Sequence, residues 1–193
     1  MPSFCLPKAH EFCDTLPGEQ RNMRFFLFGV SLIAGCAAAG AAAFPSSGPT
    51  IGGSRAVLQG KVAAAPVNAP LAVKRAIWAA NQLASKPYRF GGGHKSFVDT
   101  AYDCSGTVSY ALGAAGLIGT PIPSSGLRNF GARGRGRWIT VYARNGHTFA
   151  EIAGLRLDTT AWNTMRRDHT WAPRWQPTYR DPRGFEARHP IGL

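Results

Sequence analysis

The chain has 193 residues, and its 22 Lys and Arg against 10 Asp and Glu give a formal net charge of +12. Such a basic surface favours anionic partners such as nucleic acid, a membrane face or an acidic cell-wall polymer, and charge does not choose among them. The first third does not have the pattern of a packed domain. About 120 residues remain after it, which leaves room for one domain only.

The N-terminal segment, residues 1–36, has the layout of a secretory signal. Met23 and an arginine precede a compact apolar run that ends in small residues before Cys36. Residues 1–22 are polar, so we expect the true start at Met23. Ile-Ala-Gly-Cys over 33–36 resembles a bacterial lipobox, in which the cysteine is lipidated. Two alternatives are an uncleaved anchor helix over about 25–43, close to the ~20 residues of a membrane span, and cleavage after an alanine run.

Residues 37–69 are mostly Ala, Gly, Pro and Ser, which predicts a flexible linker. Residues 70–193 are then the folded domain, with a Trp- and Arg-rich C-terminal extension whose aromatic residues we expect to pack against a sheet. The domain opens with a predicted helix that ends before Pro87. Its apolar positions share one face: Val73, Ala76, Ile77, Ala80, Leu83 and Ala84.

Cys104 lies where a glycine-rich loop gives way to a second predicted helix, which ends at Gly116. In the first turn of a helix, the free N–H groups and the helix dipole favour a thiolate. The alternative is a buried, inert cysteine. Cys5 and Cys13 precede Met23 and Cys36 is predicted to be lipidated, so Cys104 is the only free thiol of an exported protein, which favours a nucleophile.

Three strands are predicted after this helix, at 138–142, 147–152 and 155–159, with a tight turn at Ala153-Gly154. A two- or four-residue loop places Glu151 opposite Arg156. His147 and Asp158 then share a face as diagonal neighbours, with Cα atoms roughly 7–8 Å apart. A three-residue loop would separate them. Cysteine, histidine and acid follow in the order of papain-like thiol hydrolases, with the backbone N–H of Cys104, near Ser105, as an oxyanion donor.

These motifs resemble the NlpC-type family of bacterial cell-wall cysteine endopeptidases. The nucleophile motif is Pro-Tyr-Arg-Phe-Gly-Gly over 87–92 followed by Asp-Cys-Ser-Gly over 103–106; supporting features are Pro-Ser-Ser over 123–125 with Gly131, and Gly-His over 146–147 with a polar residue at 158. The resemblance covers about residues 70–160. The chain departs from the family by having Asp158 where histidine is usual, and by lacking a Pro-Gly-Asp before the sheet.

The resemblance implies an α+β fold with a papain-like NlpC-type core, in which the nucleophile helix packs on an antiparallel sheet. It implies cleavage of peptidoglycan stem peptides, commonly at the D-γ-glutamyl–diamino-acid bond. Cys104 would attack the carbonyl, His147 would carry the proton and Asp158 would orient His147. Tyr88 would line the site and contact the substrate, and we place Asp103 and Ser105 in the same substrate-binding and oxyanion set.

We therefore expect an exported, monomeric cysteine peptidase of the cell envelope, anchored in the membrane by a lipid and facing the periplasm. The alternatives are a papain-like amidase or acyltransferase, and a non-catalytic envelope-binding lipoprotein. The Arg-Gly run over 133–137 resembles RNA-binding tails, but it is short and the export signal argues against nucleic acid. No spacing of Cys, His, Asp and Glu suggests a metal or cofactor, and we expect solvated or capping roles for His94, His169 and His189.

Overall fold

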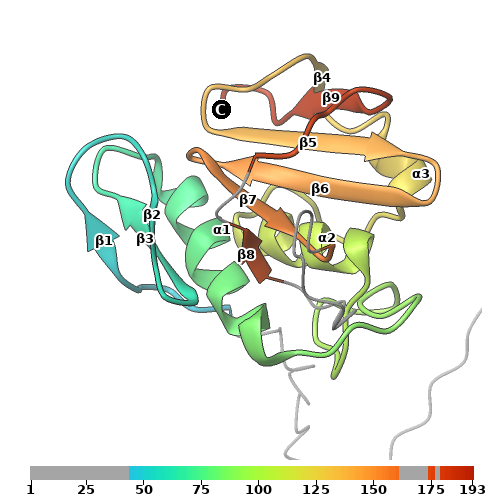
Figure 1. Ribbon diagram of the computed structural model, residues 1–193, viewed down its shortest axis with the longest axis horizontal. Coiled ribbons are helices and arrows are strands. Elements are labelled where there is room, and N and C mark those ends of the chain that lie inside the picture. Colours follow the sequence, from blue (N-terminus) through green and yellow to red (C-terminus); the bar gives the residue numbers. More distant parts are fainter. Residues whose placement is uncertain (1–43, 161–173, 177–178) are drawn as a thin grey trace, which may run out of the picture. The chain divides into compact units, whose positions relative to one another are not determined.

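The computed structural model describes residues 44–160, 174–176 and 179–193, which form an α+β domain (Figure 1). The helices are α1 (Leu71–Gln82), the 3-10 turn η1 (Leu83–Ser85), α2 (Cys104–Ala114) and α3 (Ser124–Leu127). The strands are β1 (Thr50–Ile51), β2 (Val57–Gln59), β3 (Val62–Pro66), β4 (Ala132–Arg133), β5 (Ile139–Arg144), β6 (His147–Ile152), β7 (Leu155–Asp158), β8 (Arg174–Gln176) and β9 (Glu186–His189).

The first three strands form a small sheet in the order β1-β3-β2, beside α1. Ala63, Ala64 and Ala65 are buried, because their short side chains let β3 lie close against the helix. Asn81 of α1 fixes the contact by accepting from the Ala63 N–H at 2.8 Å and donating to the Ala63 carbonyl at 2.9 Å. The prediction of a flexible linker over 37–69 is therefore wrong for 50–66, where small residues serve close packing instead of flexibility.

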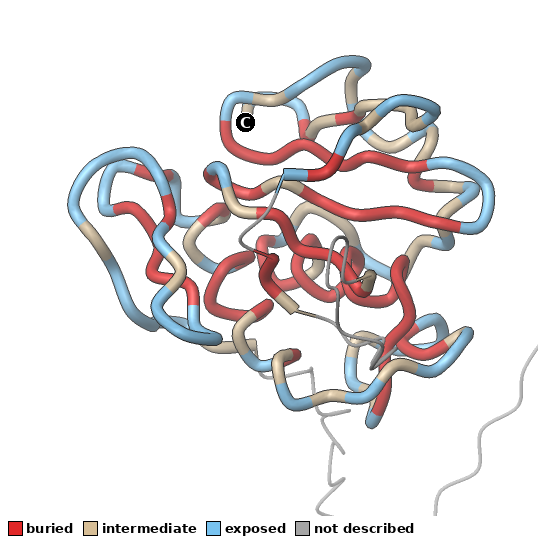
Figure 2. The backbone as a smooth tube through the Cα atoms, viewed as in Figure 1, coloured by how far each residue is buried: buried red, intermediate tan, exposed pale blue. Residues whose placement is uncertain are grey.

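The two predicted helices are confirmed. In α1 the expected apolar face is buried, and the helix passes into η1 before Pro87. Almost every residue of α2 is buried, so this helix is drawn mostly in red in Figure 2. The helix ends at Ala114 with Ala115 as its cap residue, and Gly116 follows with φ of 74°, a left-handed conformation that glycine adopts at little cost.

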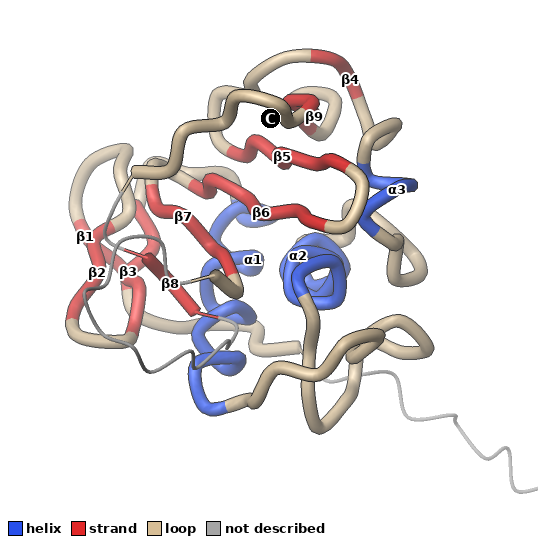
Figure 3. The backbone as a smooth tube through the Cα atoms, turned by 45° about the vertical axis from the view of Figure 1, so that its right-hand side comes forward, coloured by secondary structure: helices blue, strands red, loops and turns tan. Residues whose placement is uncertain are grey.

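The larger sheet has the strand order β4-β9-β5-β6-β7-β8, and all of its pairs are antiparallel. Figure 3 shows α2 nearly end-on beneath β6 and β7. The apolar residues of one sheet face, including Val141, Ala150 and Leu157, complete the core with α1 and α2. The predicted strands at 147–152 and 155–159 agree with β6 and β7, while the strand predicted at 138–142 lies at Ile139–Arg144.

The hairpin between β6 and β7 has the predicted register. Ile152 pairs with Leu155, and Glu151 pairs with Arg156 across the two-residue turn. Ala153 and Gly154 occupy this turn with φ of 48° and 87°, as the tight right-handed twist of the hairpin requires. His147 and Asp158 consequently emerge on the same face of the sheet, opposite to the face that α2 covers, at the end of the hairpin where Thr148 adjoins Cys104.

The C-terminal extension contributes two strands to this sheet. Trp175 in β8 is buried, and its indole N–H donates to Asn81 Oδ1 at 2.8 Å, so packing of this tryptophan against the sheet is confirmed. Strand β9 inserts between β4 and β5. Trp162, Trp171 and His169 lie outside the described residues. The arginines at 133, 135 and 137 are exposed to solvent.

No helix in the described part of the chain is both long and apolar enough to cross a membrane. The predicted signal region over 1–36, with Met23 and the lipidation site Cys36, lies outside the described residues.

Candidate active site

Helix α2 begins at a capped N-terminus that orients Cys104. Asp103 is the capping residue, and its carboxylate accepts from the Gly106 N–H at 2.8 Å. The same carboxylate accepts from the Gly91 N–H at 3.1 Å and lies 2.8 Å from His94 Nε2. Asp103 was predicted to belong to the substrate-binding set. The structure instead uses its carboxylate to hold the glycine loop onto the helix start.

The loop over 91–93 is rich in glycine because it passes directly over the first turn of α2. A Cβ at Gly106 would lie 2.1 Å from the Gly92 carbonyl oxygen, and a Cβ at Gly92 would lie 2.5 Å from the Ala101 carbonyl oxygen. Side chains larger than hydrogen are therefore excluded on both sides of the contact. The glycines therefore allow the loop to pack closely against the helix start that carries Cys104.

Cys104 carries a free thiol that is 7% exposed. Burial raises the pKa of this thiol, and the neighbouring Asp103 charge raises it further. Hydrogen bonds from the backbone N–H groups of Thr148, Ser105 and Cys104 itself lower the pKa but do not outweigh these two effects. The prediction that the helix start stabilises a thiolate is thus wrong in its net direction, because desolvation exceeds the contribution of the helix N–H groups.

The Thr148 N–H reaches the thiol because β6 and β7 separate at this end of the hairpin. Their pairing ends at Ala150 with Leu157. In a regular antiparallel ladder the next hydrogen-bonded pair would be Thr148 with Thr159. The Thr148 N–H instead donates to Cys104, so the sulfur lies beside the residue that follows His147 in β6.

His147 and Asp158 form the pair that their register predicts. His147 Nε2 lies 3.2 Å from Asp158 Oδ1, with the imidazole 8% and the carboxylate residue 1% exposed. Thr160 also donates to Asp158 Oδ1, through its backbone N–H and its hydroxyl, each at 3.0 Å. Because Nε2 is engaged by Asp158, the second ring nitrogen, Nδ1, is the one left for a proton transfer with another group. Among the described residues, no hydrogen bond joins the imidazole to the thiol.

Arg180 is a further residue of the site that the sequence did not predict. Its Nη1 lies 2.8 Å from Asp158 Oδ2 and 3.2 Å from His147 Nε2, and it donates to the Thr160 hydroxyl. Arg156 approaches the same carboxylate, at 3.5 Å. Arg180 lies in the extension, 22 residues beyond Asp158, with no motif around it to reveal this contact.

The net effect of these contacts is an ionised Asp158. Burial raises the pKa of this carboxyl, but the hydrogen bonds from His147 and the Thr160 N–H, with the electrostatic effects of His147 and Arg180, lower it by more. A buried carboxylate with this many donors is held in one orientation. It is therefore suited to fix the ring of His147.

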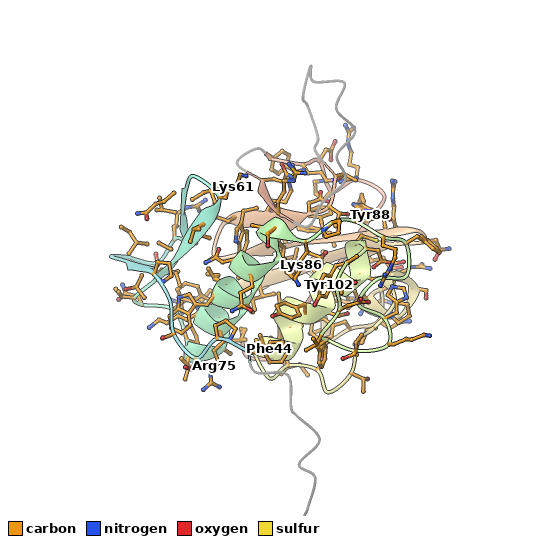
Figure 4. The ribbon with its side chains drawn as sticks, turned by 90° about the horizontal axis from the view of Figure 1, so that it is seen from below. Phe44, Lys61, Arg75, Lys86, Tyr88 and Tyr102 are labelled. Carbon is orange, nitrogen blue, oxygen red and sulfur yellow. The ribbon has the colours of Figure 1, made fainter. Side chains whose placement is uncertain are left out.

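Tyr88 and Ser105, the other predicted site residues, differ from each other in their contacts. Tyr88 forms a bridge with Tyr102, and both tyrosines are labelled in Figure 4. Burial raises the pKa of Tyr88, and the neighbouring Cys104 and Asp103 add to this effect. The Ser105 hydroxyl donates to Asp103 Oδ1 at 3.1 Å, so its side chain is engaged at the helix start.

His94 was expected to be solvated or to cap a helix, and it joins the network at the start of α2. Its Nε2 lies 2.9 Å from the Ser105 hydroxyl and 2.8 Å from Asp103 Oδ2. Serine, histidine and aspartate also form catalytic triads, but there the two partners use different ring nitrogens. Here both contact Nε2, so the imidazole cannot relay a proton between them. His94 thus stabilises the loop over the helix start.

Within the described residues, no three His, Cys, Asp or Glu side chains are grouped as a metal site requires. Comparison of the chain with models of known protein families finds no match, and no curated protein matches it. The NlpC-type resemblance accordingly depends on the motifs at 87–92, 103–106 and 146–158 and on the geometry of the residues they contain.

Proposed function

We propose that the chain is an exported thiol peptidase of the papain-like NlpC type that hydrolyses peptide stems of bacterial peptidoglycan. The observation that carries the proposal is the His147–Asp158 pair at 3.2 Å, together with a free thiol held against the adjacent Thr148 N–H. A nucleophile, a base and a residue that orients the base are the minimum set for covalent hydrolysis of an amide.

In the first half of the reaction, Cys104 Sγ forms a bond to the carbonyl carbon of the substrate. Because burial keeps the thiol protonated at neutral pH, its proton passes to Nδ1 of His147 as the bond forms. The backbone N–H of Cys104 donates to the developing oxyanion. The intermediate then expels the amine, which takes the proton from Nδ1 as the C–N bond breaks, and a thioester on Cys104 remains.

In the second half, a water molecule attacks the thioester while Nδ1 of His147 accepts one of its protons. The C–S bond breaks, the proton returns to sulfur, and the carboxylic acid fragment leaves. In the tautomer that this mechanism requires, Nε2 donates to Asp158 throughout, and the 3.2 Å contact keeps the ring in the orientation that the two transfers need. Arg180 and Thr160 keep the carboxylate in place.

The proposed location and partners follow from the N-terminal sequence. We take Met23 as the start, residues up to Cys36 as an export signal, and lipidated Cys36 as a membrane anchor facing the periplasm, with peptidoglycan stems as substrate and the protein as a monomer. Mass measurement of the mature N-terminus tests the anchor. A diacylated or triacylated Cys36 is the expected result, and an unmodified N-terminus elsewhere contradicts it.

A non-catalytic envelope-binding lipoprotein is the second candidate, and one observation favours it. The thiol is 7% exposed and burial raises its pKa, as in a cysteine that serves only packing. In that case Cys104→Ala retains cell-wall binding and the cellular phenotype. A papain-like amidase or acyltransferase would use the same three residues on another acyl donor.

The decisive experiment is cleavage of defined stem peptides by the purified full chain. We expect wild type to shorten a peptide at the D-γ-glutamyl bond, while Cys104→Ala and His147→Asn show no cleavage above background. His189→Asn is the matched control, since His189 lies in β9 and its Nδ1 is at hydrogen-bond distance from the Gly134 carbonyl. Wild-type rates in Cys104→Ala, or no cleavage by the folded wild type, would contradict the proposal.

A further inference from the structure

A pocket of about 340 Å³ lies on the sheet face that carries His147, and arginine dominates its lining. The lining residues are Arg144, Arg180, Asp181, Arg183 and Phe185. Three positive charges and one negative charge leave a net charge of +2 around the pocket. An anionic group is therefore the chemistry that this space favours.

The arginines differ in whether they are already neutralised. Arg180 pairs with Asp158 at 2.8 Å, and Arg183 pairs with its neighbour Asp181. The guanidinium of Arg144 instead lies over the ring of Phe185, 4.6 Å from its centroid. No carboxylate of a described residue lies within ion-pairing distance of Arg144. Stacking on Phe185 occupies one face of the guanidinium and leaves the N–H groups at its edge available for hydrogen bonds. These N–H groups match a carboxylate in a bidentate geometry.

Arg144 is also the direct neighbour of His147. The two residues face each other in the β5–β6 pair, where Cβ atoms are roughly 5 Å apart. The Phe185 ring lies edge-on to the His147 imidazole, with centroids 6.1 Å apart. The pocket therefore begins beside the imidazole.

The position of the pocket decides which part of a substrate would enter it. In amide hydrolysis the imidazole gives its proton to the leaving amine, so the leaving fragment lies on the imidazole side of the attacked carbonyl. The acyl fragment remains attached to sulfur, toward the start of α2.

We infer that this pocket binds a carboxylate of the leaving fragment through Arg144, with Phe185 contacting the aliphatic part of the same residue. The inference rests on the proposed hydrolase function and specifies its substrate. The residue after the cleaved bond would be a diamino acid with a second, free carboxylate, in preference to one whose carboxylate is amidated.

The test compares γ-D-glutamyl-2,6-diaminopimelate with its side-chain carboxamide as substrates of the full chain. We expect kcat/KM to favour the free carboxylate by about 10- to 100-fold, the range of a hydrogen bond to a charged group. In Arg144→Gln this ratio should fall toward one, while the control Arg133→Gln, an exposed arginine in β4, keeps the wild-type ratio. Equal cleavage of both peptides by wild type, or an unchanged ratio in Arg144→Gln, would overturn the inference.

A binding measurement separates this inference from the proposed function. Calorimetric titration of full-length Cys104→Ala with 2,6-diaminopimelate should give a Kd at least tenfold tighter than titration of the Cys104→Ala, Arg144→Gln double variant. Binding that depends on Arg144 without cleavage of either peptide overturns the hydrolase and supports the pocket. Cleavage with neither discrimination nor binding dependent on Arg144 overturns the pocket alone. Failure of both measurements overturns both.

Discussion

At the scale of single residues, the site is organised around the carboxylate of Asp158. It is 1% exposed and lies within 3.5 Å of donors from His147, Thr160, Arg180 and Arg156. A charge so deeply buried is tolerated only when nearly all of its acceptor sites are used. The same donors that stabilise the charge also determine the orientation of the His147 ring.

This arrangement predicts how stability depends on pH. The pKa of Asp158 is lower in the folded chain than the roughly 3.9 of an unfolded aspartate. Its stabilising contribution is therefore complete above about pH 4 and is lost as the pH falls through the folded value. We expect Asp158→Asn to lower the free energy of unfolding by about 3–5 kcal/mol at pH 7, as for one broken buried ion pair, and by up to about 1 kcal/mol less than that at pH 3.

Urea denaturation of wild type and Asp158→Asn between pH 3 and pH 7 measures this difference. Asp181→Asn is the control, because its ion pair with Arg183 is exposed and contributes little at any pH. A destabilisation by Asp158→Asn that stays constant across this range would show that the charge of Asp158 does not stabilise the fold.

The thiol gives a second prediction at this scale. Burial raises the pKa of Cys104 above its ordinary 9.0, so the free chain holds a thiol rather than a thiolate at neutral pH. We expect the rate of alkylation by iodoacetamide to be low at pH 7 and to rise with pH beyond 9 without a plateau between pH 5 and 8. Such a plateau would instead reveal a preformed thiolate–imidazolium pair, in which His147 is protonated before the substrate arrives.

Three residues of the site were predictable from sequence, and others were not. Cys104 follows from its place before a helical pattern, and His147 with Asp158 follows from the register of a hairpin with a two-residue turn. Arg180 was missed because its contact joins segments without any local pattern. The raised pKa of Cys104 was missed because burial depends on the packing of the whole domain, which the sequence motif does not encode.

At the scale of elements, Asn81 of α1 connects both sheets. Its side chain bonds the N–H and carbonyl of Ala63 in β3 and accepts from the indole of Trp175 in β8. One side chain therefore satisfies polar groups that would otherwise be buried without partners. An asparagine inside a predicted helix gave no indication of this role.

We expect Asn81→Ala to lower the free energy of unfolding by about 2–4 kcal/mol, since it leaves three buried polar groups without their partner. Arg75→Ala is the matched control, because Arg75 lies on the exposed face of the same helix and its loss should change stability by less than about 0.5 kcal/mol. Urea denaturation measures both variants. Equal effects of the two substitutions would refute the connecting role of Asn81.

The elements themselves were predicted unequally. In the strands at 147–152 and 155–159, the side chains that face the core alternate with those that face away from it, and a clear turn signal separates the two strands. The two-residue period of a β-strand was therefore evident from the sequence. The strands β1, β2 and β3 consist of only two to five residues. The segment that contains them is rich in alanine, glycine and proline. Their stability depends on packing against α1 rather than on their own propensity, and composition alone therefore suggested a linker.

At the scale of the whole molecule, the site depends on three segments that are distant in sequence. The loop over 91–106 supplies Cys104, the β6–β7 hairpin supplies His147 and Asp158, and the extension supplies Arg180 and Phe185. The extension also adds β8 and β9 to the sheet. The extension, which lies outside the part of the chain that resembles the NlpC-type family, thus supplies residues of the candidate site.

The central claim is that Cys104 acts as a nucleophile with His147 as its base. Intact-protein mass spectrometry of the full chain, quenched in acid during turnover of a γ-D-glutamyl stem peptide, tests it most directly. We predict an added mass equal to the acyl fragment, mapped to the peptide containing Cys104, released by hydroxylamine as a thioester is, and absent from Cys104→Ala and His147→Asn. Cleavage of the peptide without such an adduct, or an adduct that persists in Cys104→Ala, would contradict this account.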